Sequence, residues 1–158
     1  MQDHQYIIIA RALHVAAVVL WIGGVGFVAT VLIPALKKIA EPARRLALFE
    51  ALERRFSLQA KGLTLAAGLS GLYMLFALDA WNRYLRPEFW WMHLMTPVWL
   101  IFSLVLFVLE PLFLHRWFHA RVVHDGERAF DLLHNLHLIL LTLSVIAVLG
   151  AVAGSHGF

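Results

Sequence analysis

Hydrophobic residues gather in four long runs along the chain, at residues 6–36, 58–78, 89–114 and 132–154. A helix that crosses the hydrocarbon core of a bilayer needs about 20 mostly apolar residues, and each run supplies that length. The runs are continuous and lack the alternation of apolar and polar residues that marks a transmembrane β-strand. The pattern therefore predicts an all-α, integral membrane four-helix bundle, with residues 1–158 forming one domain.

The stretch between the first two runs has a different pattern. Residues 43–59 place Leu46, Phe49, Leu52 and Phe56 near one helical face, with arginines and glutamates elsewhere. This spacing predicts an amphipathic cytoplasmic helix. It either lies on the membrane surface or extends the second apolar helix into the cytoplasm.

Composition supports a membrane protein. Hydrophobic residues make up 61% of the chain and charged residues 15%, against about 45–50% and about 25% in soluble domains. The absence of cysteine excludes disulfides, cysteine-ligated iron–sulfur clusters, a thiol nucleophile and a c-type haem. The basic residues that give the net charge of +3 lie beside the apolar runs, so we expect no nucleic-acid partner.

Lysine and arginine predict the orientation in the membrane, because cytoplasmic connections carry an excess of both. The connections after the first and third runs hold Lys37, Lys38, Arg44, Arg45, Arg54, Arg55, Lys61, Arg116, Arg121 and Arg128. The opposite side holds Arg11, Arg83 and Arg86. We therefore expect a bacterial-type inner membrane protein with both termini outside, in the periplasm.

Small and polar residues on the apolar runs indicate where the helices meet. Glycines that allow close backbone approach are Gly23, Gly24, Gly26, Gly68 and Gly71. Thr96, Ser103 and Glu110 recur at seven-residue spacing on the third run. Because lipid offers these polar side chains no partner, we expect them to face the bundle interior.

Four of the nine histidines lie within or at the edge of the apolar runs: His14, His93, His134 and His137. Ionisable residues are rare in such positions and are usually functional. At 1.5 Å per residue, His14 lies about 12 Å and His93 about 6 Å from the outer ends of their helices, whereas His137 lies about 24 Å from its outer end. Two axial ligands of one haem should lie at similar depths, which favours His14 with His93 over His14 with His137.

The chemistry of these side chains suggests a metal or haem site. Neutral imidazole suits haem iron, copper and zinc, and Arg11 precedes His14 by one helical turn, where it would meet a haem propionate. Haem b held by His14 and His93 is the leading interpretation. Copper bound by His93, Met92 and Met95 is the alternative, because Cu(I) accepts thioether ligands. A bundle without a cofactor is the third.

Glu110 is a further ionisable residue inside an apolar run, where burying its charge costs free energy. It precedes Pro111 and lies near the cytoplasmic end of the third helix. Lys61, His134 and His137 lie at a comparable depth on neighbouring helices. An ion pair with Lys61 would limit the cost of burying the carboxylate, and a proton-relay position is the other interpretation.

Three segments resemble the CopD-like and HemJ-like membrane proteins. The run ALHVAAVVLWIGGVGFVATVLIPAL, with His14, Trp21 and Gly23, is similar to their first helix. RRFSLQAKGLTLAAGLSGLY, residues 54–73, resembles their second helix, and WMHLM, residues 91–95, resembles the start of the third helix of HemJ.

The resemblance implies a four-helix membrane bundle. For HemJ-like proteins it implies haem b held by the first-helix histidine, which matches His14, and protoporphyrinogen oxidation. For CopD-like proteins it implies copper uptake or resistance. Met95 stands where HemJ has a lysine, and the arginine late in its first helix is missing, which disfavours protoporphyrinogen oxidase activity. The chain also lacks the eight-helix context and the methionine–histidine array of CopD.

Together these patterns predict a membrane-embedded haem b protein that transfers electrons, with a membrane redox partner or a second copy of itself. Whether it is an oxidoreductase in its own right stays open at this stage. The alternatives are copper transport or resistance, and a non-catalytic accessory subunit of a larger membrane complex. The sequence contains no nucleotide-binding loop or hydrolase triad motif.

Overall fold

The computed structural model describes residues 2–155, with side chains described at residues 4–41, 43–112 and 125–154. All regular structure in this part of the chain is helical. Four of its helices are long and apolar enough to cross a membrane, namely His4–Lys37, Ala43–Ala77, Pro87–Leu112 and Asp125–Gly154. The prediction of four apolar helices is confirmed, and it indicates a multi-pass membrane protein.

The first apolar helix consists of three consecutive elements: α1 (Gln2–Phe27), the π-helical η1 (Val28–Leu32) and α2 (Ile33–Lys37). Pro34 explains the wider turn, because it has no backbone N–H and its ring clashes with the preceding turn of a regular helix. The helix therefore continues through the proline.

The second apolar helix and the amphipathic segment form one element, α3 (Pro42–Ala77). Of the two arrangements predicted for the segment, the structure shows the extension of the second helix. Glu41 is extended, and Pro42 is the first helical residue, a position where its missing N–H costs nothing. The 36 residues of α3 give a length of about 54 Å, which exceeds the hydrocarbon thickness of a bilayer.

Part of the apolar face of the amphipathic segment packs against protein, whereas Leu52 of the same face is exposed. Leu46 and Phe49 are buried in a cluster with Ile33 of α2 and Phe130. The rings of Phe49 and Phe130 meet edge to face, with centroids 5.6 Å apart. This end of α3 is therefore held by the first and fourth apolar helices.

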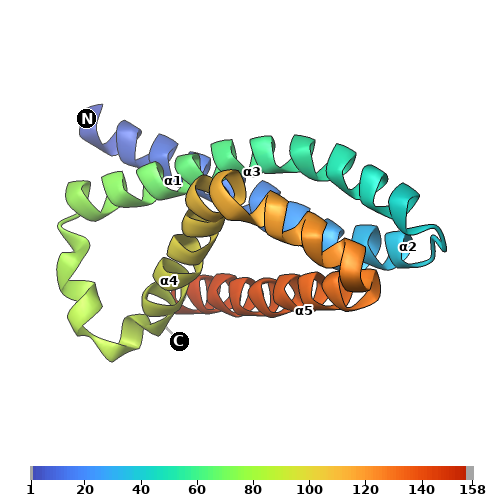
Figure 1. Ribbon diagram of the computed structural model, residues 1–158. Helices are drawn as coiled ribbons and strands as arrows, with labels where there is room; N and C mark the ends of the chain where they lie inside the picture. The colour runs from blue at the N-terminus through green and yellow to red at the C-terminus, as the bar shows by residue number, and fades with distance from the viewer. Residues whose placement is uncertain (1, 156–158) are drawn as a thin grey trace.

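The rest of the chain begins with two short 3-10 turns, η2 (Ala80–Leu85) and η3 (Pro87–Phe89), followed by α4 (Trp90–Leu104). The chain then changes direction through the π-helical η4 (Val105–Leu114), which leads into α5 (His115–Ser155) (Figure 1). Pro111 lies inside η4 and removes a hydrogen-bond donor where the helix bends.

A break inside α5 marks the start of the fourth apolar helix. Asp125 has non-helical dihedral angles (φ −154°, ψ 84°), and its Oδ1 accepts a hydrogen bond of 3.2 Å from the backbone N–H of Arg128. This is the geometry of an N-cap. The fourth apolar helix thus starts at Asp125, seven residues before the apolar run that begins at Leu132.

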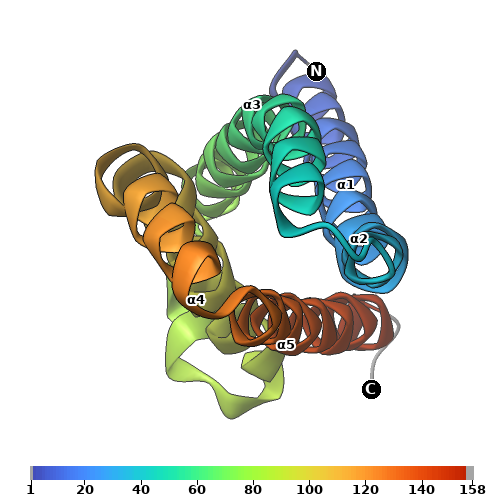
Figure 2. The same ribbon diagram turned by 45° about the vertical axis from the view of Figure 1, so that its right-hand side comes forward.

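α1 and α3 lie side by side, and α5 returns along α4 to reach α1 and α2 (Figures 1 and 2). A second cluster fills the space where α1, α3 and α4 meet, and it contains Trp21, Val25, Ala60 and Phe102. The Trp21 and Phe102 rings meet edge to face at 4.8 Å.

Aromatic rings pack directly onto glycines at these contacts. Phe56 of α3 lies against Gly24 of α1, and Trp99 of α4 lies against Gly68 of α3. The glycines at 150 and 154 receive Trp90 and Trp91 in the same way. The predicted role of glycines in close helix approach holds for Gly24 and Gly68, whereas a Cβ at Gly23 would meet nothing within 4 Å.

Large apolar side chains cover the outer surface of the described helices. Val19 is 62% exposed, Leu58 75% and Leu149 63%. Contiguous apolar surface of this kind suits a lipid environment.

Replacing Gly68 by alanine tests the contact between α3 and α4. The new Cβ would lie 2.7 Å from Trp99 Cε2, and the ring cannot move away without losing its hydrogen bond to Thr64 O. We expect Gly68→Ala to lower the unfolding free energy by about 1–3 kcal/mol. Circular dichroism during thermal unfolding in detergent measures this.

Gly62→Ala is the matched control, because a Cβ there meets nothing within 4 Å and alanine favours the helix by up to about 1 kcal/mol. Equal stability of the two variants would contradict the packing described.

Candidate functional site

One face of α3 carries a line of polar and small residues. Ser57, Lys61, Thr64, Gly68 and Gly71 alternate at spacings of four and three, which places them on the same side of the helix. Side chains of α1, α4 and η4 contact this line. Of the predicted site residues, Lys61 belongs to this line, and His14 and Glu110 contact it.

His14 contacts the end of this line nearest Ala77. Its Nδ1 lies 2.8 Å from Ala67 O and 3.2 Å from Ser70 Oγ. Because a carbonyl oxygen only accepts hydrogen bonds, Nδ1 is protonated, and in the neutral imidazole Nε2 then carries the lone pair. Nε2 makes no hydrogen bond with any residue whose side chain is described.

Gly71 lies directly against the His14 ring, since a Cβ at this position would lie 3.1 Å from His14 Cε1. Ser70 is itself fixed, with its hydroxyl donating to Ala66 O at 2.5 Å. The ring orientation of His14 is therefore set by α3 on the Nδ1 side. A histidine that ligates a metal is usually held in this way, with one nitrogen on a backbone carbonyl and the other on the metal.

His93 lies in the first turn of α4, and its ring contacts the connection that precedes this helix. Its Nε2 lies 2.8 Å from Tyr84 O, its Nδ1 lies 3.2 Å from Phe89 O, and the ring is exposed. Both nitrogens thus face backbone carbonyls. The hydrogen bonds of His14 lead to α3 and those of His93 to η2 and η3, and none of them links the two rings.

The other residues predicted to bind haem or copper beside His14 and His93 differ in burial. Met92 is buried and Met95 is half-buried, whereas Arg11 is exposed. Arg11 makes no hydrogen bond or ion pair with the part of the chain that the structure describes. Its guanidinium is available to a ligand that carries an anionic group near His14.

Glu110 contacts the other end of the polar line. Ser57 Oγ lies 2.6 Å from both carboxylate oxygens of Glu110, and Lys61 Nζ lies 3.2 Å from Oε1. The side chains of Lys61 and Glu110 are 28% and 21% exposed, and Ser57 is buried. The carboxylate is therefore stabilised by one charge and one hydroxyl, which offsets part of its desolvation cost.

The two histidines predicted near Glu110 bond to backbone instead. His134 Nε2 lies 2.9 Å from Ala29 O of η1. His137 Nδ1 lies 2.8 Å from Leu133 O, one turn back on its own helix. The structure thus joins Glu110 to Lys61, while the hydrogen bonds of both histidines lead away from it.

Three buried polar atoms lie without a hydrogen-bond partner among the described residues: Trp21 Nε1, Thr64 Oγ1 and Ser103 Oγ. Thr64 belongs to the polar line, between the levels of Lys61 and Gly68. Its backbone oxygen accepts a hydrogen bond of 2.9 Å from Trp99 Nε1. Of the predicted series on the third run, Thr96 lies 2.8 Å from the Tyr84 hydroxyl.

A haem and a metal ion held by side chains alone need different numbers of protein ligands. No group of three or more His, Asp or Glu side chains that could hold an ion occurs in the part of the chain that is described. A porphyrin brings its own four nitrogens and needs only axial side chains. His14, with its Nδ1–H on Ala67 O, presents Nε2 in the form that such an axial ligand requires.

Ser57 and Trp99 were not singled out from the sequence. A signal for Ser57 was present, because it starts the spacing of four and three on α3. Trp99 gave no such signal, since an aromatic residue in an apolar run has the same pattern as an ordinary residue of the hydrophobic core. Four of the remaining histidines lie outside the described side chains: His115, His119, His124 and His156.

Comparison of the chain with protein-family models, with curated proteins and with solved structures finds no match. The likeness to the CopD-like and HemJ-like proteins therefore rests on the quoted residues alone.

Replacing Lys61 by methionine tests how the Glu110 carboxylate is stabilised. The change leaves a mostly buried carboxylate with only the Ser57 hydroxyl, so we expect the unfolding free energy to fall by about 1–3 kcal/mol. Adding Glu110→Gln should restore part of this loss. A double-mutant cycle measured by thermal unfolding in detergent gives the coupling.

The ion pair of Lys37 with Asp131 supplies the control, because its side chains are more exposed, at 35% and 56%. Lys37→Met should cost only about 0–1 kcal/mol. An absence of coupling between Lys61 and Glu110 would contradict the stabilising role of the pair.

Proposed function

We propose that the four apolar helices insert as a bundle into a bacterial-type inner membrane, with both termini on the periplasmic side. Ten of the thirteen lysines and arginines lie on the connections assigned to the cytoplasm, as the positive-inside rule requires. The exposed leucines and valines of the outer surface support contact with lipid.

Within this bundle we propose a haem b site with an electron-transfer role. The observation that carries the proposal is the His14 imidazole, whose Nδ1–H is committed to Ala67 O and whose Nε2 makes no hydrogen bond with a described side chain or backbone group. His14 would be an axial ligand, and Arg11 would pair with a propionate. A bound haem would supply reversible one-electron transfer.

His93 is the candidate for the opposite axial position. To serve there, its ring would exchange the hydrogen bond to Tyr84 O for the haem iron. A membrane redox partner or a second copy of the chain would deliver or receive the electron. These roles extend the interpretation of the sequence, in which the same two histidines were paired by depth.

We expect the purified wild-type protein to show a Soret band that sharpens on dithionite reduction, with about one haem per chain by pyridine haemochrome assay. His14→Ala should abolish the band. His93→Ala should keep the haem and convert it from a low-spin to a high-spin spectrum, because one axial ligand is lost. His4→Ala is the matched control, since His4 is exposed, and it should leave the spectrum unchanged.

A wild-type spectrum in the His14 variant would overturn the haem assignment. Metal analysis of the same samples separates the alternatives. A colourless protein that carries copper would identify the copper interpretation with His93, Met92 and Met95. A colourless, metal-free protein that co-purifies in fixed ratio with a larger complex would identify an accessory subunit.

A further inference from the structure

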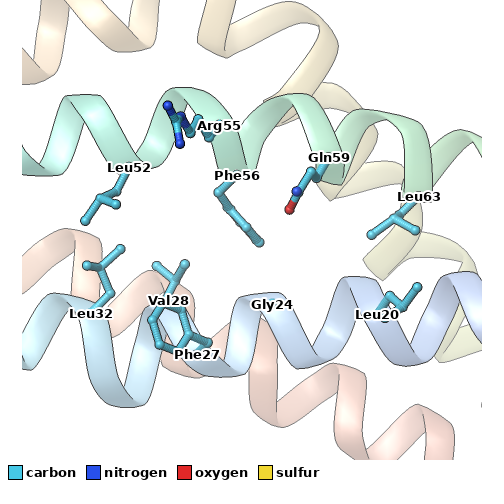
Figure 3. A pocket seen from close by; sticks show the side chains of 10 residues that line it. All are labelled: Leu20, Gly24, Phe27, Val28, Leu32, Leu52, Arg55, Phe56, Gln59 and Leu63. Atoms are coloured by element: carbon cyan, nitrogen blue, oxygen red, sulfur yellow. The ribbon is translucent and has the colours of Figure 1, made fainter.

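A groove of about 320 Å³ lies between α1 and α3, on a side of the helix pair that does not include His14. Apolar side chains from both helices form its walls, among them Leu20, Phe27, Leu32, Leu52 and Leu63. Figure 3 shows Leu52 opposite Leu32 and Leu63 opposite Leu20 across the gap. Arg55 and Gln59 are its polar lining residues.

The groove opens outward from the helix pair. Leu20 is 62% exposed and Phe27 55%, so these walls are covered by no other described element. Gly24 forms part of the floor, where Phe56 packs against its backbone. In a bilayer this opening would face the lipid.

The lining residues of α3 are ordered along the helix. Arg55, Gln59 and Leu63 follow one another at four-residue spacing, so each lies about 6 Å further along the axis than the one before. Figure 3 shows Gln59 and Leu63 pointing from α3 toward α1, with Arg55 lying along α3 at the rim. Leu52 precedes these three lining residues on α3, and from Arg55 onward the order is a cation, then an amide, then an apolar wall.

This order matches the order of groups in a phospholipid. The apolar run of α3 starts at residue 58, which places Arg55 at the level of the headgroups when the helix spans the bilayer. A guanidinium binds a phosphate oxygen pair well, an amide N–H donates to an ester carbonyl, and leucines pack against an acyl chain. Arg55 makes no hydrogen bond or ion pair with the described residues, so it is free for such a ligand.

We propose that this groove binds one anionic phospholipid of the cytoplasmic leaflet. Arg55 holds the phosphate, Gln59 bonds the ester region, and one acyl chain lies between Leu20 and Leu63. Basic pockets between membrane helices on the cytoplasmic side bind anionic headgroups in this manner. The inference rests on the proposed membrane insertion and orientation and is independent of haem binding.

Native mass spectrometry of the full chain in detergent tests the proposal, with phosphatidylglycerol and phosphatidylcholine as separate probes. We expect one phosphatidylglycerol to stay bound per chain and phosphatidylcholine to dissociate. Arg55→Gln should weaken phosphatidylglycerol binding about fivefold, as for the loss of one interfacial charge. Arg54→Gln is the matched control, because Arg54 is the adjacent exposed arginine but does not line the groove.

Leu20→Trp provides a second variant that leaves Arg55 intact. Its larger side chain fills the acyl-chain part of the groove from an exposed position, so phosphatidylglycerol should again be lost. Equal losses in Arg54→Gln and Arg55→Gln would overturn the proposal in favour of diffuse surface charge. A mass of two chains that falls to one in Leu20→Trp would overturn it in favour of a chain–chain contact.

Haem content is recorded on the same samples. Lipid binding that depends on Arg55 in a colourless protein would support the groove while rejecting the haem site. A coloured protein without selective lipid binding would support the haem site while rejecting the groove. The two proposals can therefore fail separately.

Discussion

Polar groups on an apolar helix need hydrogen-bond partners within the protein, because hydrocarbon offers them none, and the partners that α3 finds on other helices govern the packing around it. Ser57 and Lys61 bond to Glu110 of η4, Thr64 O accepts the indole of Trp99, and Ala67 O accepts His14. Each of these bonds joins α3 to another helix. The glycines between them let aromatic rings come close enough for the bonds to form.

Two chemically different ends follow from this arrangement. At the His14 end, a neutral imidazole would present the lone pair of Nε2 beside small residues. This arrangement suits a ligand whose own groups balance its charge. At the Glu110 end, the carboxylate forms an ion pair with Lys61, so the two charges balance each other. The ends are separated by roughly 13 residues of α3 between Ser57 and Ser70, or about 20 Å. The proposed electron-transfer role concerns the first end, and the ion pair of the second joins α3 to η4.

Much of the fold could be predicted from the sequence, because length and hydropathy decide whether a helix can cross a membrane. The amphipathic pattern of residues 43–59 also gave a helix, but it could not distinguish a surface helix from an extension of α3. That choice depends on Phe130, far along the chain, which buries Phe49. Depth arithmetic paired His14 with His93, and it could not foresee that the 3-10 turn η2 places Tyr84 O against the His93 ring. Helix rotation and connection geometry, which hydropathy does not encode, decide such contacts.

The unbroken course of α3 has a mechanical consequence. A helix of 36 residues without an internal proline or non-helical residue behaves as a stiff rod over its whole length. Leu46 and Phe49 near one end and Ser70 near the other therefore move together. The end of α3 that carries Phe49 is thereby coupled mechanically to the Ala67 carbonyl that holds the His14 ring.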